Sequence, residues 1–127
     1  MKSIFHSLSV LIVDDDEQAR YVMNAVLERL GVETVYEAES ALVAQERVAE
    51  AAGMIDLVIC DMKMPGMSGL EFLTQVRKCF PDMPFMMVTG NAEIDTAIEA
   101  RNLGVDAYIS KPFSPREIKE KLVELTQ

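Results

Sequence analysis

The centre of the chain reads IDLVICDMKMPGMSG over residues 55–69. Its first six residues form a largely apolar run without regular alternation, which is typical of a short strand buried on both faces. Asp61 follows this run directly, and a loop with a Pro-Gly pair comes next. Ser68 and Glu71 then have the spacing of a capping box, which predicts the start of a helix. The stretch therefore predicts a buried strand, an acid at its end, a loop and a helix.

The same alternation of strand and helix extends along the rest of the chain. Strands are predicted at residues 10–13, 32–36, 55–60, 85–88 and 107–110. Apolar residues recur between them with helical spacing, which directs Val22 of the first helix and Ile94 and Ile98 of the fourth towards the core. Right-handed crossovers place the helices on both faces of a parallel sheet. We therefore predict an α/β fold, a doubly wound (βα)5 parallel sheet that is flavodoxin-like, with strand order 2-1-3-4-5.

Length and composition favour one globular domain. The chain has 127 residues, of which 50% are hydrophobic and 26% charged, so we expect residues 1–127 to form a single domain without a separate output domain. The formal net charge of -9 argues against direct binding to nucleic acid, which requires clustered Lys and Arg. No apolar run approaches the roughly 18 residues of a membrane span. Cys60 and Cys79 are too few for a disulfide framework, so we expect a reduced protein in the cytoplasm, away from the membrane.

Chemically active side chains follow four of the five predicted strands. They are Asp14, Asp15 and Asp16 after the first strand, Asp61 after the third, Thr89 after the fourth and Lys111 after the fifth. Taken singly, each is an ordinary turn, capping or solvated residue. Taken together, they lie at the carboxyl ends of parallel strands, where open α/β sheets bind ligands. Carboxylates that converge repel one another unless a cation joins them, so we predict a Mg²⁺ site, with Mn²⁺ as an alternative.

Four segments resemble the signature blocks of response-regulator receiver domains. They are VDDD at 13–16, DMKMPGMSG at 61–69, VTG at 88–90 and YISKPF at 108–113. The resemblance covers essentially the whole chain in the same order and spacing. It implies a signalling switch of a two-component system rather than an enzyme. Such a domain takes a phosphoryl group from a sensor histidine kinase or a phosphotransfer protein, and so becomes a phosphoprotein in a phosphorelay.

The resemblance also implies how the site is built. Asp61 is the phospho-acceptor and a direct Mg²⁺ ligand. Asp15 and the backbone carbonyl of Lys63 are implied as the other direct ligands, whereas Asp14 acts mainly through metal-bound water. Lys111 pairs with the phosphoryl group, and the peptide bond that follows it is expected to be cis.

A change of state is implied as well. Thr89 moves towards the phosphoryl group, and Tyr108 rotates inward to fill the space left behind. The fourth helix, fifth strand and fifth helix then form a changed face for a downstream effector or output domain. We expect a monomer or a weak, phosphorylation-dependent dimer.

Other positions carry narrower expectations. Lys63 and Asn91 each lie two residues after a site residue, and our hypothesis is that they set the lifetime of the aspartyl phosphate; the alternative is that both are solvated loop residues. Ala107 stands where a subfamily that dimerises to drive transcription usually has Asp, which argues against that dimer. For the methionines within residues 62–67, ordinary packing is favoured over an adaptable contact surface.

Three alternatives remain open at this point. A small Mg²⁺-dependent phosphohydrolase would also use an Asp nucleophile, but such enzymes usually place a second acid two residues later, where this chain has Lys63. A flavin-binding flavodoxin-like protein would cradle a phosphate in its first loop, where three aspartates would repel it. The third alternative is an interaction module that is never phosphorylated.

Overall fold

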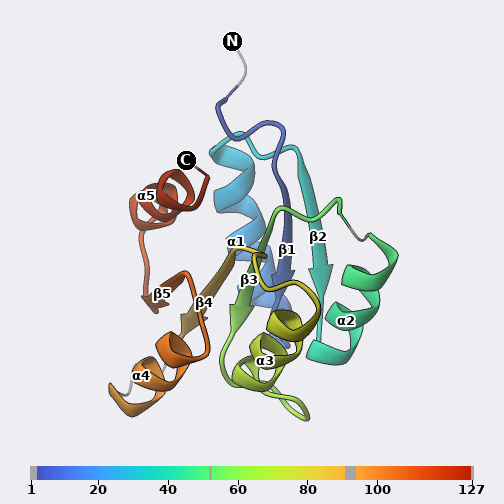
Figure 1. Cartoon of the computed structure of the whole chain (residues 1–127). Coiled ribbons are helices and arrows are strands. Elements are labelled where there is room, and N and C mark those ends of the chain that lie inside the picture. The colour runs from blue at the N-terminus through green and yellow to red at the C-terminus, as the bar shows by residue number, and fades with distance from the viewer. Residues whose placement is uncertain (1–2, 52, 91–93, 127) are drawn as a thin grey trace.

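The computed structural model describes residues 3–51, 53–90 and 94–126. Within these ranges, strands and helices alternate along the chain (Figure 1). They are β1 Ser9–Val13, α1 Glu17–Arg29, β2 Thr34–Ala38, α2 Ala41–Glu50, β3 Leu57–Asp61, α3 Gly69–Cys79, β4 Phe85–Thr89, α4 Ile94–Asn102, β5 Ala107–Ser110 and α5 Pro115–Leu125. The strands form one parallel sheet in the order β2-β1-β3-β4-β5. The predicted doubly wound α/β fold is confirmed.

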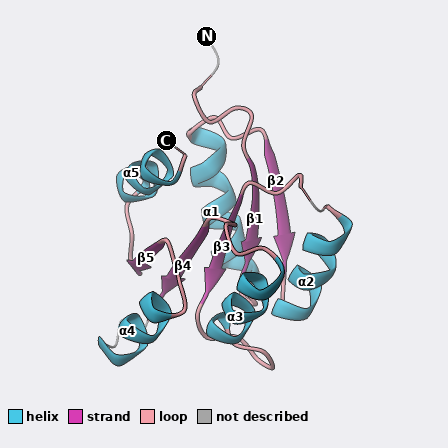
Figure 2. Cartoon of the chain, in the orientation of Figure 1, coloured by secondary structure: helices cyan, strands magenta, loops and turns pink. Residues whose placement is uncertain are grey.

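Helices cover both faces of the sheet (Figure 2), which divides the core into two layers. Leu11 and Val13 of β1 belong to the layer under α2, α3 and α4, whereas Val10 and Ile12 belong to the layer under α1 and α5. Successive side chains of a strand point to opposite faces, so both sets are buried. This explains why the strands read as continuous apolar runs.

Serine side chains begin three of the helices, and for Ser68 the sequence predicts this. Ser40 caps α2, and Ser68 and Ser114 form complete capping boxes at α3 and α5. Asp16 is the N-cap of α1, where its carboxylate accepts the N–H of Gln18 at 3.0 Å. Asp16 thus has a structural role, and the group of converging carboxylates is formed by Asp14, Asp15 and Asp61 without it.

Two residues predicted for the core are exposed, and for them the prediction is wrong. The side chain of Val22 in α1 is 43% exposed and that of Ile98 in α4 is 50% exposed. Among the described side chains of α4, Ala100 is the buried one. The side chain of Ile94 lies outside the described residues.

The second strand begins two residues later than predicted. Val32 is apolar and buried, but its N–H donates to the carbonyl oxygen of Leu27 at 3.0 Å, as part of the turn that ends α1. Gly31 permits this turn because it adopts a φ of 93°. Val32 therefore packs into the core as part of a helix cap.

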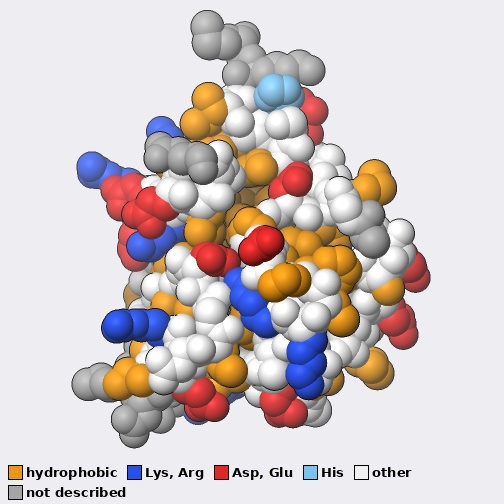
Figure 3. Space-filling model, viewed as in Figure 1, with side chains coloured by type: hydrophobic (Ala, Val, Ile, Leu, Met, Phe, Trp, Pro, Cys, Tyr) orange, Lys and Arg blue, Asp and Glu red, His pale blue; other side chains and the backbone are white. Residues whose placement is uncertain are grey.

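Charged side chains of both signs lie on the surface, and the two cysteines are free, in agreement with the composition. Acidic and basic side chains are both spread over the face shown in Figure 3. Cys60 is buried in β3 and Cys79 is exposed at the end of α3, and both are free thiols. Among the described residues, no helix combines the length and the apolar character that a membrane crossing requires.

Candidate functional site

The register of the sheet brings together the acids that end β1 and β3. Val13 of β1 pairs with Cys60 of β3. The next residues along the two strands, Asp14 and Asp61, therefore emerge side by side. The N–H of Asp14 also donates to the carbonyl oxygen of Ala38 at 3.1 Å, which extends the pairing of β1 with β2 by one residue. The backbone of Asp14 is thus held by β2.

β4 and β5 bring a hydroxyl and an ammonium to the same edge. Thr89 at the end of β4 pairs with Ser110 of β5, and the N–H of Lys111 donates to the carbonyl oxygen of Thr89 at 2.7 Å. Asp61 pairs with Val88, so Thr89 lies one residue further along the neighbouring strand. These strand ends meet at the edge to which the arrowheads point (Figure 1).

Three carboxylates converge at this edge of the sheet. Asp14, Asp15 and Asp61 each offer one carboxylate oxygen, and these atoms all lie within 4.8 Å of one another. Asp14 is buried and Asp15 is exposed, so the group opens to solvent on the side of Asp15. Hard oxygen donors with room for water are the ligands that Mg²⁺ prefers in proteins. The donor set therefore fits a small divalent cation.

One ammonium lies among these carboxylates. Nζ of Lys111 is 3.3 Å from Oδ2 of Asp14 and 3.8 Å from Oδ1 of Asp61. A single positive charge does not neutralise three carboxylates. Burial, followed by the negative charge of Asp14, raises the pKa of Asp61 from its ordinary 3.8 to about 6, although Lys111 opposes the shift. A bound cation would relieve this repulsion, so the electrostatics of the site also fit a metal ion.

The loop after β3 is closed tightly against the end of the strand. The N–H of Gly69, the first residue of α3, donates to the carbonyl oxygen of Met62 at 2.8 Å. A Cβ atom at Gly69 would collide with the carbonyl oxygen of Asp61 and would lie 2.9 Å from Cα of Met62. Only glycine allows α3 to start this close to Asp61. The capping serine before it was predicted, but this steric role was not.

A cleft of about 340 Å³ lies beside the acids, between α1 and the loop after β5. Asp14, Asp61 and Lys111 lie on its polar side. Its other walls are mainly apolar and include Val22 and Phe113. The exposure of Val22 is therefore explained, because its side chain lines this open cleft.

A match to a known family decides what kind of domain carries this site. The family model of the response regulator receiver domain matches residues 10–123. The chain belongs to this family. The order of the strands is thus that of a receiver domain, and receiver domains are signalling switches rather than classical enzymes.

Similar proteins cover nearly the whole of this receiver domain. The chemotaxis protein CheY homolog of Campylobacter jejuni is 40% identical over 93% of this chain and 92% of its own length. Chemotaxis protein CheY1 of Helicobacter pylori is 40% identical over 91% of this chain and 94% of its own. The crystal structure of a response regulator receiver domain protein from Clostridium thermocellum has a TM-score of 0.88 at 30% identity, with 93% of each chain covered.

The structure describes all but one of the remaining predicted site residues of this receiver domain. Thr89 is buried at 1% exposure, and Tyr108 of β5 is partly buried and packs against the layer under α2, α3 and α4. The peptide bond between Lys111 and Pro112 is cis, as predicted. The side chain of Lys63 is exposed, whereas Asn91 lies outside the described residues.

The methionines of the loop after β3 mostly pack inward. Met62 and Met64 are 3% and 8% exposed, and Met67 is partly buried against the same core layer. Ordinary packing is therefore confirmed for Met62 and Met64.

Proposed function

We propose that this receiver domain accepts a phosphoryl group on Asp61 in the presence of Mg²⁺. The observation that carries the proposal is the convergence of three carboxylate oxygens within 4.8 Å beside the Lys111 ammonium. Asp14, Asp15, Asp61 and the backbone carbonyl of Lys63 would hold the metal. Mn²⁺ takes the same kind of oxygen ligands and would serve as an alternative.

The chemistry rests on the carboxylate of Asp61. Its oxygen attacks the phosphorus of a phosphohistidine on a sensor histidine kinase or a phosphotransfer protein. The new O–P bond forms as the N–P bond breaks, and the electron pair of that bond returns to the imidazole nitrogen, which takes up a proton. Lys111 turns from the carboxylates to a phosphoryl oxygen as a compact point charge. Bound Mg²⁺ supplies charge neutralisation for the phosphoryl oxygens.

The phosphorylated state would differ from the free state at Thr89 and Tyr108. The hydroxyl of Thr89 gains a charged acceptor in one state only, and that differential interaction shifts the population. Tyr108 turns inward into the space beside it. The face formed by α4, β5 and α5 then changes and meets a downstream effector or output domain in the cytoplasm. The protein would act as a monomer or a weak, phosphorylation-dependent dimer.

Lys63 would tune how long this state lasts. Its exposed side chain lies two residues after Asp61, so it would control the access of attacking water to the acyl phosphate. Asn91 is proposed to act with it. A Lys63→Ala variant should change the dephosphorylation rate of purified phosphoprotein, and an unchanged rate would remove this part of the proposal.

The decisive experiment uses a small phosphoryl donor. The protein is incubated with acetyl phosphate and Mg²⁺, and its intact mass is measured. Wild type should gain one phosphoryl adduct that disappears when EDTA replaces Mg²⁺, and Asp61→Asn should gain none. Asp82→Asn, which removes an exposed carboxylate from the loop after α3, is the matched control and should behave as wild type. No adduct on wild type, or equal adducts on wild type and Asp61→Asn, would overturn the proposal.

A further inference from the structure

One guanidinium in α1 connects the first acid of the site to the neighbouring strand β2. Nη1 of Arg20 donates to the backbone carbonyl oxygen of Asp14 at 2.8 Å. Nε of the same side chain lies 3.3 Å from Oε1 of Glu37. The Arg20 side chain is only 16% exposed, so the guanidinium is largely shielded from water, whereas the side chain of Glu37 is 42% exposed. No motif or spacing in the sequence points to Arg20.

The acceptor on Asp14 is a carbonyl whose direction matters for the next residue. The peptide unit is planar, so this carbonyl lies in one plane with the nitrogen and Cα of Asp15. The N–H of Asp14 is already held by Ala38 on β2. With the carbonyl held by Arg20 as well, the path of the chain from Asp14 into Asp15 is fixed. Both residues contribute oxygens to the carboxylate group.

Arg20 is itself oriented by a second contact. Oε2 of Glu37, the oxygen that Arg20 does not meet, accepts a hydrogen bond from Nδ2 of Asn24 at 3.2 Å. The carboxylate of Glu37 is thus held between two side chains of α1. A guanidinium has several N–H donors in a fixed plane, so it meets the carbonyl and the carboxylate together, whereas the ammonium of Lys is a single point charge.

We propose that Arg20 is a positioning residue for the metal-binding acids of this receiver domain. Its guanidinium fixes the peptide between Asp14 and Asp15, so that both carboxylates face the cation together with Asp61. Glu37 supports it by orienting the guanidinium. The inference rests on the proposed function, because it requires that the carboxylates bind Mg²⁺.

A positioning role predicts a change in Mg²⁺ affinity that is opposite in sign to the change expected from charge repulsion alone. Arg20 is a cation near a cation site, so charge repulsion alone would make Mg²⁺ bind more tightly when Arg20 is removed. A role in folding alone would leave the affinity of the folded protein unchanged. Positioning instead predicts weaker binding, since partners that orient metal ligands typically change affinity by about tenfold or more when removed.

The test measures Mg²⁺ affinity by isothermal titration calorimetry on folded protein at fixed pH and ionic strength. Arg20→Gln should bind Mg²⁺ about tenfold more weakly than wild type. Arg20→Lys keeps the positive charge but lacks the planar set of N–H donors that meets the carbonyl and the carboxylate together. This variant should also bind Mg²⁺ more weakly. Arg116→Gln is the matched control, because Arg116 is 87% exposed and, among the described residues, its ion pair is with Glu120 on its own helix. The Mg²⁺ affinity of this variant should equal that of wild type.

A second variant keeps the test valid if Arg20→Gln fails to unfold cooperatively in a metal-free thermal melt. Glu37→Gln should weaken Mg²⁺ binding by a smaller factor. The double variant that combines Glu37→Gln with Arg20→Gln should bind Mg²⁺ no more weakly than Arg20→Gln alone, because the two residues act through one contact.

The outcomes separate this inference from the proposed function. If wild type binds no Mg²⁺, the proposed function fails. If wild type binds Mg²⁺ and the folded Arg20→Gln, Arg20→Lys and Glu37→Gln variants bind it equally well or more tightly, only the positioning role of Arg20 is overturned.

Discussion

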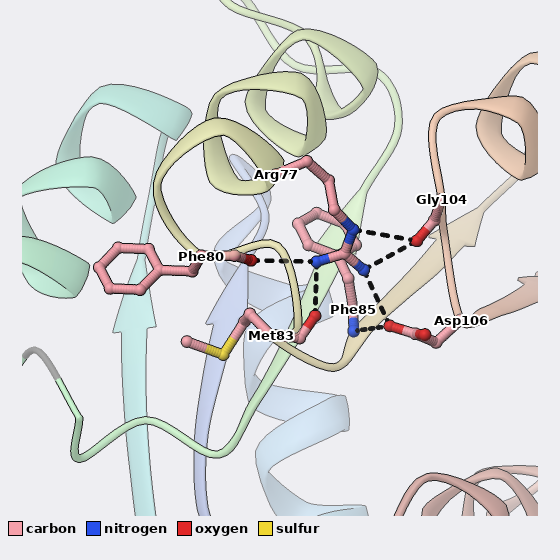
Figure 4. Close-up of polar contacts among 6 residues, drawn as sticks. All are labelled: Arg77, Phe80, Met83, Phe85, Gly104 and Asp106. Atoms are coloured by element: carbon pink, nitrogen blue, oxygen red, sulfur yellow. Dashed lines mark hydrogen bonds and ion pairs between the residues drawn. The ribbon is translucent and has the colours of Figure 1, made fainter.

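Carboxylates meet basic side chains at both ends of the sheet, in two different arrangements. At the amino ends of β4 and β5, Arg77 of α3 forms a clamp (Figure 4). It donates to the carbonyl oxygens of Gly104 and Met83, and its Nη2 lies 2.9 Å from Oδ2 of Asp106. The same carboxylate oxygen accepts the N–H of Phe85 at 2.8 Å. Here one positive charge meets one negative charge, and several backbone groups are satisfied.

At the carboxyl ends of the strands, the negative charges of the acids are not matched by the positive charge of Lys111. Lys111 faces Asp14 and Asp61, and Asp15 lies beside them. Burial, followed by the negative charge of Asp14, raises the pKa of Asp61 despite the nearby Lys111. The Arg77 clamp therefore contributes stability, whereas the group of three carboxylates reduces stability in the absence of a cation. Carboxylates whose ionised form is disfavoured are expected where a bound ligand supplies the missing positive charge.

Removal of Arg77 should have the largest effect on folding. Arg77→Met keeps an apolar stem but removes the donor to the carbonyl oxygens of Gly104 and Met83. The carboxylate of Asp106 keeps the N–H of Phe85 but loses its charged partner. Hydrogen bonds to charged groups are worth more than neutral ones, so we expect a loss of about 3 kcal/mol in the free energy of unfolding. Urea denaturation measures it. Arg116→Met is the control and should change stability by less than about 0.5 kcal/mol, because exposed pairs contribute little. A loss no larger than in this control would contradict the role of the clamp.

Addition of one methyl group at Gly69 should have the next largest effect. In Gly69→Ala the new Cβ collides with backbone atoms of Asp61 and Met62, which cannot move aside easily. Overpacking of this kind costs about 2 kcal/mol. The displaced Asp61 should also gain less phosphoryl adduct from acetyl phosphate. Gly90→Ala is the control for stability, because a Cβ there meets nothing within 4 Å. Equal stability of the two variants would show that the loop after β3 is not constrained as described.

The smallest effect is a gain of stability when Asp61 loses its charge. The folded protein keeps a proton on Asp61 up to about pH 6, whereas the unfolded chain releases it near pH 4. Between these values the folded state binds more protons, so the free energy of unfolding of wild type falls as the pH rises. Asp61→Asn lacks this fall. After allowance for solvent screening, it should be about 1 kcal/mol more stable at pH 7 in EDTA.

The pH dependence distinguishes this effect from a general change in packing. The difference between Asp61→Asn and wild type should vanish below about pH 4. Urea denaturation at several pH values, with Asp82→Asn as the control for the loss of one carboxylate, measures it. Parallel stability curves for wild type and Asp61→Asn would mean that the pKa of Asp61 is not raised in the folded protein.

The sequence predicts the fold because apolar runs and capping serines are local signals. It also predicts the convergence of the acids with Lys111, since parallel strands all end at one edge. Periodicity shows which way Val22 and Ile98 point, but whether another element covers them depends on how helices of different length lie on the sheet. The roles proposed for Arg20 and observed for Gly69 depend on nearby carbonyl oxygens. Every residue has a carbonyl, so the sequence carries no signal for such contacts.

The unequal burial of the two thiols makes the native chain suited to site-selective labelling. Burial, followed by the negative charges of Asp61 and Asp14, raises the pKa of Cys60 well above its ordinary value, so its reactive thiolate is scarce. Cys79 is exposed on α3, two residues after Arg77. A maleimide fluorophore should therefore attach to Cys79 without any substitution. It would report motion of α3 while leaving the strand that carries Asp61 chemically untouched.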